Sequence, residues 1–362
     1  MKVYKLRRIM KGISLFSSAG IGEYFLERNG IDIVVANELI EKRSALHKTI
    51  YPNCKVITGD ITKKDTYNKI ISEASKNKID FIIASPPCQG MSVAGKNRKS
   101  EEMSLDERNY LILPVIEAIK ELDPNYIIIE NVPLLLKLVL NFGNEYLNIE
   151  EILQKELGKN YNIISSVFDT ADYGVPQHRK RAIIRIYKKG LTWNEPTKTN
   201  KLVTVEDAIG DLPPLESGEF SKLQWHFARR HDERQVEWMQ HTPTGKSAFE
   251  NEKYYPKKKN GDRIKGFHSS YRRIKWDEPS PTITIRNDAI SSQRNVHPGR
   301  KLKNGLYSDA RVLTILELFR LTGLPDNINI PKDTPEILIR QVLGECIPPL
   351  LIEALVKEIS DV

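Results

Sequence analysis

The sequence predicts an α/β fold built on a mostly parallel sheet, and three observations support this class. Strand-like runs are frequent in the first 190 residues: Gly12–Phe16, Ile31–Ala36, Lys55–Thr58, Ile79–Ala84, Tyr126–Ile129, Ile163–Phe168 and Ala182–Ile186. These runs are rich in Ile and Val and mostly continuous rather than alternating, which is typical of strands buried on both faces. Helix-like stretches separate them, and repeated strand–helix–strand units form parallel sheets with helices on both faces.

The helical stretches are expected near Gly22–Asn29, Lys42–Ile50, Thr66–Lys76, Asp106–Leu122, Asn148–Leu157, Val312–Leu321 and Ile347–Ile359. The alternating pattern ends near Trp193, and turn-forming groups such as Asp211-Leu212-Pro213-Pro214 follow it. We therefore expect three parts: an α/β domain over 1–190, an irregular domain over 191–310, and a segment over 311–362 whose helices return to the first domain.

Length and composition limit the class of protein. The chain has 362 residues and 40% apolar residues, which is enough to bury a sizeable core. It contains no apolar run of the roughly 18 residues that a membrane span needs, and no apolar segment follows its basic N-terminus as in a signal peptide. Its three cysteines lie far apart, which argues against a disulfide framework or a zinc site. We expect a cytoplasmic protein without a metal site or a membrane partner.

The positive charge is concentrated in one quarter of the chain. The formal net charge is +8, yet residues 222–311 alone contain 20 basic and 10 acidic residues. The same segment holds Trp225, Trp238 and Trp276 and five of the seven histidines. Basic groups can contact phosphates and flat rings can contact bases, so the segment favours a nucleic-acid partner, although a solvated lysine-rich surface would have the same composition.

Three strand ends offer groups suited to a nucleoside cofactor. The first strand runs into a turn of small residues, which lets backbone amides approach a ligand at a helix start: Phe16, Ser17, Ser18, Ala19, Gly20, Ile21 and Gly22. Glu38 ends the second strand, and Asp60 follows the third. Carboxylates at these places can accept hydrogen bonds from ribose hydroxyls. No third glycine is present for a pyrophosphate, so the pattern does not predict a dinucleotide.

The next strand ends carry reactive side chains. The fourth strand leads into Ser85-Pro86-Pro87-Cys88-Gln89-Gly90, where two prolines stiffen the backbone before the thiol. A lone cysteine is usually a small buried residue, but a rigid loop at the ligand edge of a sheet presents it instead. Glu130 follows the fifth apolar strand, where a carboxyl group can have a raised pKa. Arg179 and Arg181 share one face of the segment before the last strand.

Taken in order, these motifs resemble the cytosine-5 DNA methyltransferases of bacterial restriction-modification systems. The resemblance covers nearly the whole chain: Phe16–Gly22, Pro87-Cys88-Gln89, Glu130-Asn131-Val132, Gln177–Arg181, Arg273–Thr284, Arg311–Pro325 and Gly344–Pro349. It implies the Rossmann-like fold of S-adenosylmethionine-dependent methyltransferases with a smaller target recognition domain. The parts 1–190, 191–310 and 311–362 would then be the catalytic and cofactor domain, the target recognition domain, and the hinge with the C-terminal helices.

The resemblance also implies site residues. The catalytic set would be Cys88 as nucleophile, Glu130 on the cytosine ring, Arg181 and Arg179 beside it, and Pro87, Gln89 and Asn131 in support. S-adenosyl-L-methionine, converted to S-adenosyl-L-homocysteine, would contact Phe16–Gly22, Glu38, Leu39, Asp60, Ile61, Pro86, Glu345 and Cys346. The target base must leave the duplex to react. DNA contacts are expected from Ser92, Lys96, Arg98, Arg229, Arg230, Arg272, Arg273, Arg286 and Arg294, with the loop Gly90–Arg108 closing over the base.

Three departures from the family pattern keep other functions open. Ser14 stands where the family usually has Asp, Ser18 where it has a glycine, and Glu345 where it has Asn. A DNA-binding protein without catalysis is therefore an alternative, as is an RNA (tRNA) cytosine-5 methyltransferase with the same chemistry. A nicotinamide dehydrogenase would leave Cys88 and Glu130 unexplained. The main prediction is a monomeric, site-specific enzyme on double-stranded DNA, compatible with a cognate restriction endonuclease that acts on the same site.

Overall fold

The computed structural model describes residues 9–87 and 106–360. The chain divides into two compact units. The first unit comprises Met1–Asp169, Lys180–Thr197 and Pro349–Val362, and the second unit comprises Thr170–Arg179 and Lys198–Pro348. The boundaries expected from the sequence, at 190 and 310, stay predictions.

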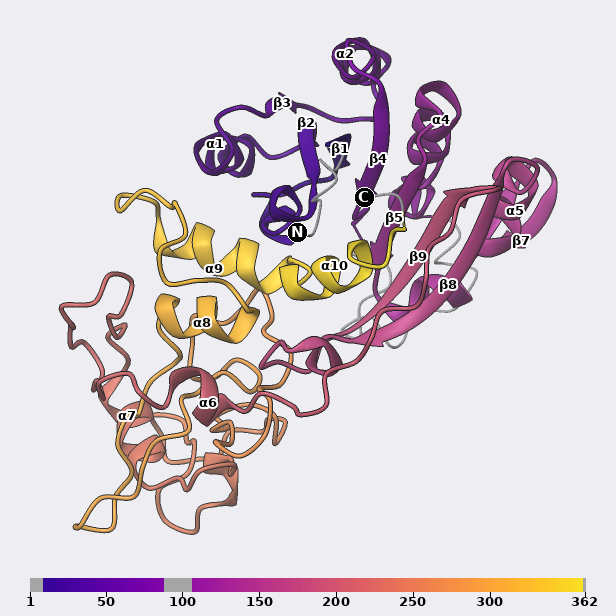
Figure 1. Ribbon diagram of the computed structural model, residues 1–362. Coiled ribbons are helices and arrows are strands. Elements are labelled where there is room, and N and C mark those ends of the chain that lie inside the picture. Colours follow the sequence, from indigo (N-terminus) through magenta and orange to yellow (C-terminus); the bar gives the residue numbers. More distant parts are fainter. Residues whose placement is uncertain (1–8, 88–105, 361–362) are drawn as a thin grey trace. The chain divides into compact units, whose positions relative to one another are not determined.

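A seven-stranded sheet forms the centre of the first unit, in the order β3-β2-β1-β4-β5-β9-β8 (Figure 1). Its strands are β1 (Met10–Leu15), β2 (Ile31–Glu38), β3 (Lys55–Thr58), β4 (Ile79–Ala84), β5 (Tyr126–Asn131), β8 (Tyr161–Asp169) and β9 (Lys180–Lys188). Strands β1 to β5 are parallel, whereas β9 is antiparallel to both β5 and β8. The predicted class, a mostly parallel α/β sheet, is confirmed, and each of the seven expected runs forms a strand.

Helices cover both faces of this sheet (Figure 1). On one face, α2 (Lys64–Ala74), α4 (Leu113–Leu122) and α5 (Ile149–Leu157) contribute to a single apolar core with the sheet. On the other face lie α1 (Glu41–Ile50) and α10 (Pro349–Val356). Every residue of β4 and β5 is buried, which explains why these two strands have continuous apolar sequences.

Short 3-10 turns replace one of the expected helical segments and the beginning of another. The stretch predicted as a helix at 22–29 consists of η1 (Ile21–Glu23) and η2 (Glu27–Asn29), and Gly30 follows with a φ of 79°. The stretch predicted from Asp106 begins as η4 (Glu107–Tyr110), and the α-helix starts only at Leu113. Further short elements of this unit that the sequence did not predict are η5 (Pro133–Lys137), β6 (Val139–Phe142) and β7 (Glu145–Asn148).

The second unit is irregular, as expected. Its described elements are η6 (Thr170–Tyr173), α6 (Val205–Ile209), α7 (Glu233–Gln240), η7 (Ala248–Glu250), α8 (Ile315–Thr322) and α9 (Glu336–Glu345). The sequence did not predict α9. A small apolar core that includes Trp238, Met239 and Tyr271 holds the loops together.

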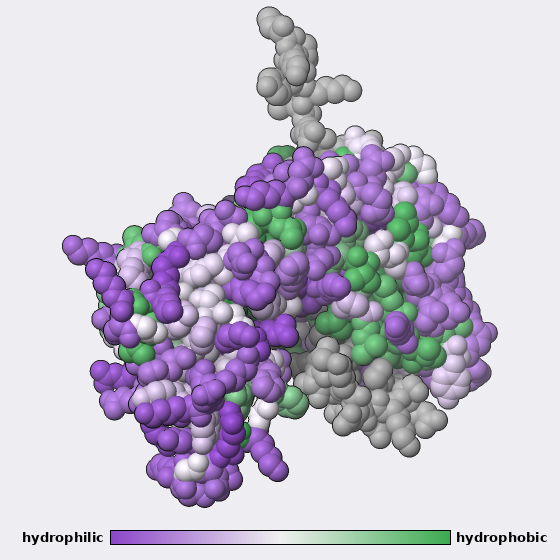
Figure 2. Space-filling view, turned by 90° about the horizontal axis from the view of Figure 1, so that it is seen from below, coloured by the Kyte–Doolittle hydropathy of each residue, from purple (hydrophilic) through white to green (hydrophobic). Residues whose placement is uncertain are grey.

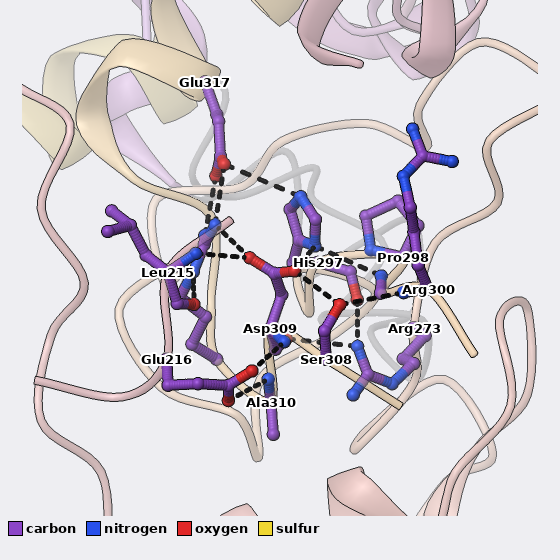
Figure 3. Close-up of polar contacts among 12 residues, drawn as sticks. Leu215, Glu216, Arg273, His297, Pro298, Arg300, Ser308, Asp309, Ala310 and Glu317 are labelled. Atoms are coloured by element: carbon purple, nitrogen blue, oxygen red, sulfur yellow. Dashed lines mark hydrogen bonds and ion pairs between the residues drawn. The ribbon is translucent and has the colours of Figure 1, made fainter. Parts of the chain in front are cut away.

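A buried ionic cluster stabilises this unit beside its small apolar core (Figure 3). The Arg311 guanidinium donates to Glu317 at 2.9 Å and to Asp309 at 2.8 Å. The His297 ring lies between the same two carboxylates, 3.8 Å from Asp309 and 3.6 Å from Glu317. Arg273 donates to the carbonyl oxygens of His297 and Asp309. The buried charges of Arg311, Asp309 and Glu317 are tolerated because they are paired and hydrogen-bonded, and Arg273 is held by hydrogen bonds to carbonyl oxygens.

This cluster predicts that acid weakens the second unit. Burial, with a smaller contribution from the Arg311 charge, lowers the pKa of His297 from 6.5 to about 4. Although burial opposes ionisation of Glu317, its pairing with Arg311 lowers its pKa from 4.5 to about 2. The unfolded chain therefore binds more protons than the folded chain at acid pH. Stability falls as the pH drops from 6.5 to 4 through His297, and from 4.5 to 2 through Glu317.

In a His297→Gln variant, the free energy of unfolding should change much less between pH 6.5 and pH 4. A pKa shift of this size corresponds to a loss of up to roughly 3 kcal/mol in the wild type over that range. Urea unfolding at several pH values measures it, with the exposed His268→Gln as the matched control. A wild-type slope in the His297 variant would contradict this assignment.

Candidate active site

The loop after β1 has a fixed and unusual shape. Phe16 and Ser18 have φ angles of 59° and 49°, and Gly20 has 73°. Such angles are uncommon for residues other than glycine, and they persist where surrounding contacts enforce them. One such contact is the hydrogen bond from the Ser17 amide to the Asn37 carbonyl oxygen at 2.9 Å. The loop is thus tied to the end of β2.

Glu38 makes a second connection between these two strand ends. Its buried carboxylate accepts from the Ser18 amide at 2.9 Å and from the Ile40 amide at 2.8 Å. The next residue, Leu39, is 64% exposed. A carboxylate beside an exposed apolar side chain suits a nucleoside, because the carboxylate can bind ribose hydroxyls and the apolar group can cover a base.

The end of β3 adds another carboxylate at the same edge of the sheet. Asp60 is half-buried, and its oxygen accepts from the amide and hydroxyl of Thr62 at 2.9 and 2.7 Å. Ile61 is buried, and Asn37 donates to the carbonyl oxygens of Ile57 and Gly59. The described residues of the first unit therefore fit a nucleoside cofactor. In the described parts of the chain, no group of three or more His, Cys, Asp or Glu side chains could hold a metal ion.

A buried polar network behind the loop was missed by the sequence analysis. The Ser14 hydroxyl donates to Glu23, and the His47 ring lies 3.3 Å from the same carboxylate. The Tyr51 hydroxyl donates to the carbonyl oxygen of Gly20 at 2.7 Å. Ser14 stands where the family resemblance implies Asp, and here the carboxylate of Glu23 accepts the hydrogen bond from its hydroxyl. Glu23 directly follows the glycine loop, but nothing in the sequence connects it to His47.

Glu130 and Arg181 form an ion pair at the ends of two neighbouring strands. The Arg181 Nε lies 2.8 Å from Glu130 Oε1, and both side chains are largely buried. Antiparallel pairing of β5 with β9 places Asn131 opposite Ala182, so that Arg181 comes next to the carboxyl group. The expectation that Arg181 supports Glu130 agrees with this geometry.

Asn131 connects this pair to the segment that precedes Cys88. Its side-chain amide donates to the Pro86 carbonyl oxygen at 3.0 Å, and its own oxygen accepts from the Val132 amide. The backbone at Pro86 and Pro87 is therefore held against the end of β5. The predicted residues Cys88, Gln89, Ser92, Lys96 and Arg98 and most of the predicted closing loop lie outside the described residues.

Arg179 lies in the second unit and makes different contacts. It is 2% exposed, and it donates to the carbonyl oxygens of Ile283 and Gly344 at 2.7 and 2.9 Å. The side-chain oxygen of Gln177 accepts a hydrogen bond from the Ile283 amide at 3.1 Å. These contacts join the Gln177–Arg181 motif to the Arg273–Thr284 motif, so the structure assigns Arg179 an organising role in its own unit. Of the predicted cofactor residues, Glu345 ends α9 in this unit and Cys346 follows it.

Gly344 is predicted to resist substitution, because α9 passes close to the chain at Thr284. A Cβ atom added at Gly344 would lie 2.3 Å from the Thr284 carbonyl oxygen. Alanine usually stabilises a helix relative to glycine, but here overpacking should lower stability by roughly 1–3 kcal/mol. Thermal unfolding followed by circular dichroism measures the effect, with Gln341→Ala on the same helix as control. A Gly344→Ala variant as stable as this control would contradict the prediction.

The structure also corrects expectations about DNA contacts. Arg273 is 1% exposed and donates only to backbone oxygens in the described contacts, so it cannot read a base edge in this conformation. Arg229 pairs with Glu336, and Arg272 bonds Glu250 and two carbonyl oxygens. Of the arginines predicted to contact DNA, Arg230, Arg286 and Arg294 remain exposed.

Two of the tryptophans in the basic segment serve the core. Trp238 is 3% exposed within the apolar core of the second unit, and Trp225 is 7% exposed and packs edge-on against Phe319. The expectation that these rings contact bases is therefore wrong. Trp276 is half-buried, with the Arg300 guanidinium over its ring at 4.3 Å.

This sheet order, with acidic residues at the end of β2 and after β3 and an ion-paired carboxylate at the end of β5, is that of a Rossmann-like methyltransferase. The family model for C-5 cytosine-specific DNA methylases matches residues 10–361, and the chain belongs to that family. It is therefore a DNA cytosine-5 methyltransferase, as the sequence predicted.

Relatives of similar length support the assignment. The chain is 64% identical to the Type II methyltransferase M1.HgaI of Avibacterium volantium over 98% of this chain and 99% of the relative. It is 30% identical to the Type II methyltransferase M1.HphI of Haemophilus parahaemolyticus over 96% and 86% of the two chains.

Solved structures share the fold at low sequence identity. A prophage-encoded E. coli protein superposes with a TM-score of 0.70 and 21% identity, covering 96% of this chain and 98% of that protein. The Entamoeba histolytica methyltransferase EhMeth gives 0.64 and 16%, covering 97% and 98%.

Proposed function

We propose that this enzyme methylates cytosine in a short, specific sequence of duplex DNA, with S-adenosyl-L-methionine as cofactor and a covalent adduct to Cys88. The single observation that best supports the chemistry is the Glu130–Arg181 ion pair at the strand end, with Asn131 holding the segment that leads to Cys88. The bound cofactor supplies an electrophilic methyl group.

Cys88 acts as the nucleophile. Carbon 5 of cytosine is a weak nucleophile, and addition of a thiolate to carbon 6 makes the ring electron-rich at carbon 5. Glu130 contacts ring nitrogen 3 and the amino group, and a proton there offsets the charge that develops as the thiolate adds. Arg181 orients Glu130 and contacts the carbonyl oxygen of the base. Once carbon 5 carries the methyl group that the cofactor would supply, loss of the carbon 5 proton to a base and elimination of the thiolate would restore the ring and the free enzyme.

The cofactor contacts are proposed for the three strand ends. Glu38 and Asp60 bind hydroxyl and amino groups of the nucleoside, and Leu39 covers its base. The loop Phe16–Gly22 holds the rest of the cofactor through its backbone. The family resemblance also implies cofactor contacts from Glu345 and Cys346, and these two contacts stay predictions.

The biological role proposed is that of the modification enzyme of a Type II restriction-modification system, because two relatives are named Type II methyltransferases. A cognate endonuclease acting on the same sequence would be the partner. We propose a monomer that works in the cytoplasm. No helix among residues 9–87 and 106–360 is long and apolar enough to cross a membrane.

Methyl transfer from labelled S-adenosyl-L-methionine tests this function. Mixed-sequence duplex DNA and tRNA are offered as separate acceptors, and bisulfite sequencing of the product locates the modified bases. Methylated cytosines in one recurring DNA context are expected. Transfer only to tRNA would favour the RNA alternative. Duplex binding without methyl transfer to either acceptor would favour the non-catalytic alternative.

A further inference from the structure

The strongest unassigned surface feature is a hairpin rich in lysine in the second unit, residues 256–265, which we call the lysine hairpin. Antiparallel pairing of Lys257 with Arg263 forms it, and the Lys258 amide donates to the Asp262 carbonyl oxygen at 2.8 Å. Gly261, with a φ of 91°, makes the turn. The segment 257–265 contains five basic residues and one acidic residue.

The base of the lysine hairpin is held in place. Pro256 is buried, and the Arg263 guanidinium donates to the Phe249 carbonyl oxygen at 2.6 Å. The same guanidinium lies over the Tyr255 ring at 4.3 Å. Arg263 is thus committed to fixing the hairpin, and the side chains that can reach a partner are the lysines.

These lysines carry charge that no neighbouring group neutralises. Lys257, Lys258, Lys259 and Lys265 are exposed, and no carboxylate in the described parts of the chain forms an ion pair with them. The one acidic side chain of the hairpin, Asp262, instead accepts from Asn260 at 2.8 Å. Hydrophilic side chains also cover much of the face of the molecule shown in Figure 2.

The chemistry of the exposed groups indicates what they bind. Arginine suits bidentate reading of a base, whereas lysine is a compact charge on a flexible stem that suits single phosphate oxygens. Phosphate contacts position a protein on the duplex and carry no sequence information directly. Of the arginines predicted for DNA contact, Arg273 is buried and Arg229 and Arg272 are paired with carboxylates. The exposed positive charge of this unit therefore includes the hairpin lysines beside Arg230, Arg286 and Arg294.

We propose that the lysine hairpin binds the phosphate backbone of duplex DNA and gives the enzyme affinity that does not depend on base sequence. The proposal rests on the function proposed above, since it takes duplex DNA as the substrate. Because a phosphate contact of this kind forms equally in the ground and transition states, it contributes to the KM for DNA and not to kcat.

The test compares two variants of the full chain that lose the same charge. The first is Lys257→Gln/Lys258→Gln/Lys259→Gln. The matched control is Lys63→Gln/Lys64→Gln/Lys69→Gln, which changes exposed lysines at and within α2 of the first unit. Fluorescence anisotropy measures binding to two duplexes, one with the methylated context and one scrambled, between 50 and 200 mM salt. Thermal unfolding checks that both variants fold.

The hairpin variant should bind both duplexes more weakly, and its plot of log affinity against log salt should be less steep by roughly one unit per lysine that contacts a phosphate. Its kcat at saturating DNA and its KM for S-adenosyl-L-methionine should be unchanged, and the control should match wild type. Wild-type binding by the hairpin variant would overturn the proposal, as would an equal loss in the control. A loss confined to the methylated context would overturn it too, because the hairpin would then read bases. If the wild type binds duplex DNA through the hairpin but methylates none, the proposed function fails while the hairpin proposal stands.

Discussion

Replacing Cys88 with alanine should reduce methyl transfer by roughly 10⁴-fold or more, because the reaction cannot proceed at a useful rate without addition of the thiolate to carbon 6. Labelled S-adenosyl-L-methionine and a duplex that contains the methylated context provide the assay. Binding of DNA and of cofactor should persist in the variant, since the side chain removed is small.

Cys54→Ala is the matched control for this experiment. Cys54 is a buried thiol, and burial, together with the nearby carboxylates of Glu23 and Asp32, raises its pKa well above the usual range. It therefore stays protonated and cannot serve as the nucleophile. The control should keep its turnover per folded molecule. Retained turnover in Cys88→Ala would remove Cys88 from the mechanism.

Glu130→Gln should lower kcat by roughly 10²–10⁴-fold, the range expected when a general acid or base is removed. Glutamine keeps the size of the side chain, but it can neither carry the proton nor form the ion pair with Arg181. Equilibrium binding of S-adenosyl-L-methionine should stay near wild type, since the proposed cofactor contacts lie at the ends of other strands. The measurement is single-turnover methyl transfer beside cofactor titration.

The exposed Glu117 on α4 offers a control with the same chemical change. Glu117→Gln should leave both the rate and cofactor binding unchanged. A Glu130→Gln variant with wild-type kcat would show that the carboxyl group takes no part in proton transfer. Equal loss of cofactor binding and rate would instead indicate a disturbed fold at the end of β5.

Much of the first unit could be predicted because its signals are local. Continuous apolar runs such as Ile79–Ala84 identify buried strands without knowledge of their neighbours. The order of the motifs along these strands then indicated the family, and Glu130 and Arg181 meet as expected. The helix expected at 22–29 was wrong because the stretch forms two short 3-10 turns, and local propensity did not distinguish these from one helix.

In the second unit, the local sequence did not predict which side chains are buried, because burial there depends on residues far apart in the sequence. Arg273 reads as a basic surface residue, yet its partners include the backbone of His297 and Asp309. From the sequence, Trp238 could be an exposed ring that contacts nucleic-acid bases, yet it lies in the apolar core of the second unit.

The sequence by itself determined the strands, the order of the motifs and the family, because each depends on residue types at short spacing. The tertiary structure decided which charges are free. It paired Arg229 and Arg272, buried Arg273, and left the lysines of the hairpin exposed. The physical reason is that a charged side chain reads the same in a sequence whether it is solvated or paired. Only the arrangement of distant segments sets its partners and its cost of desolvation.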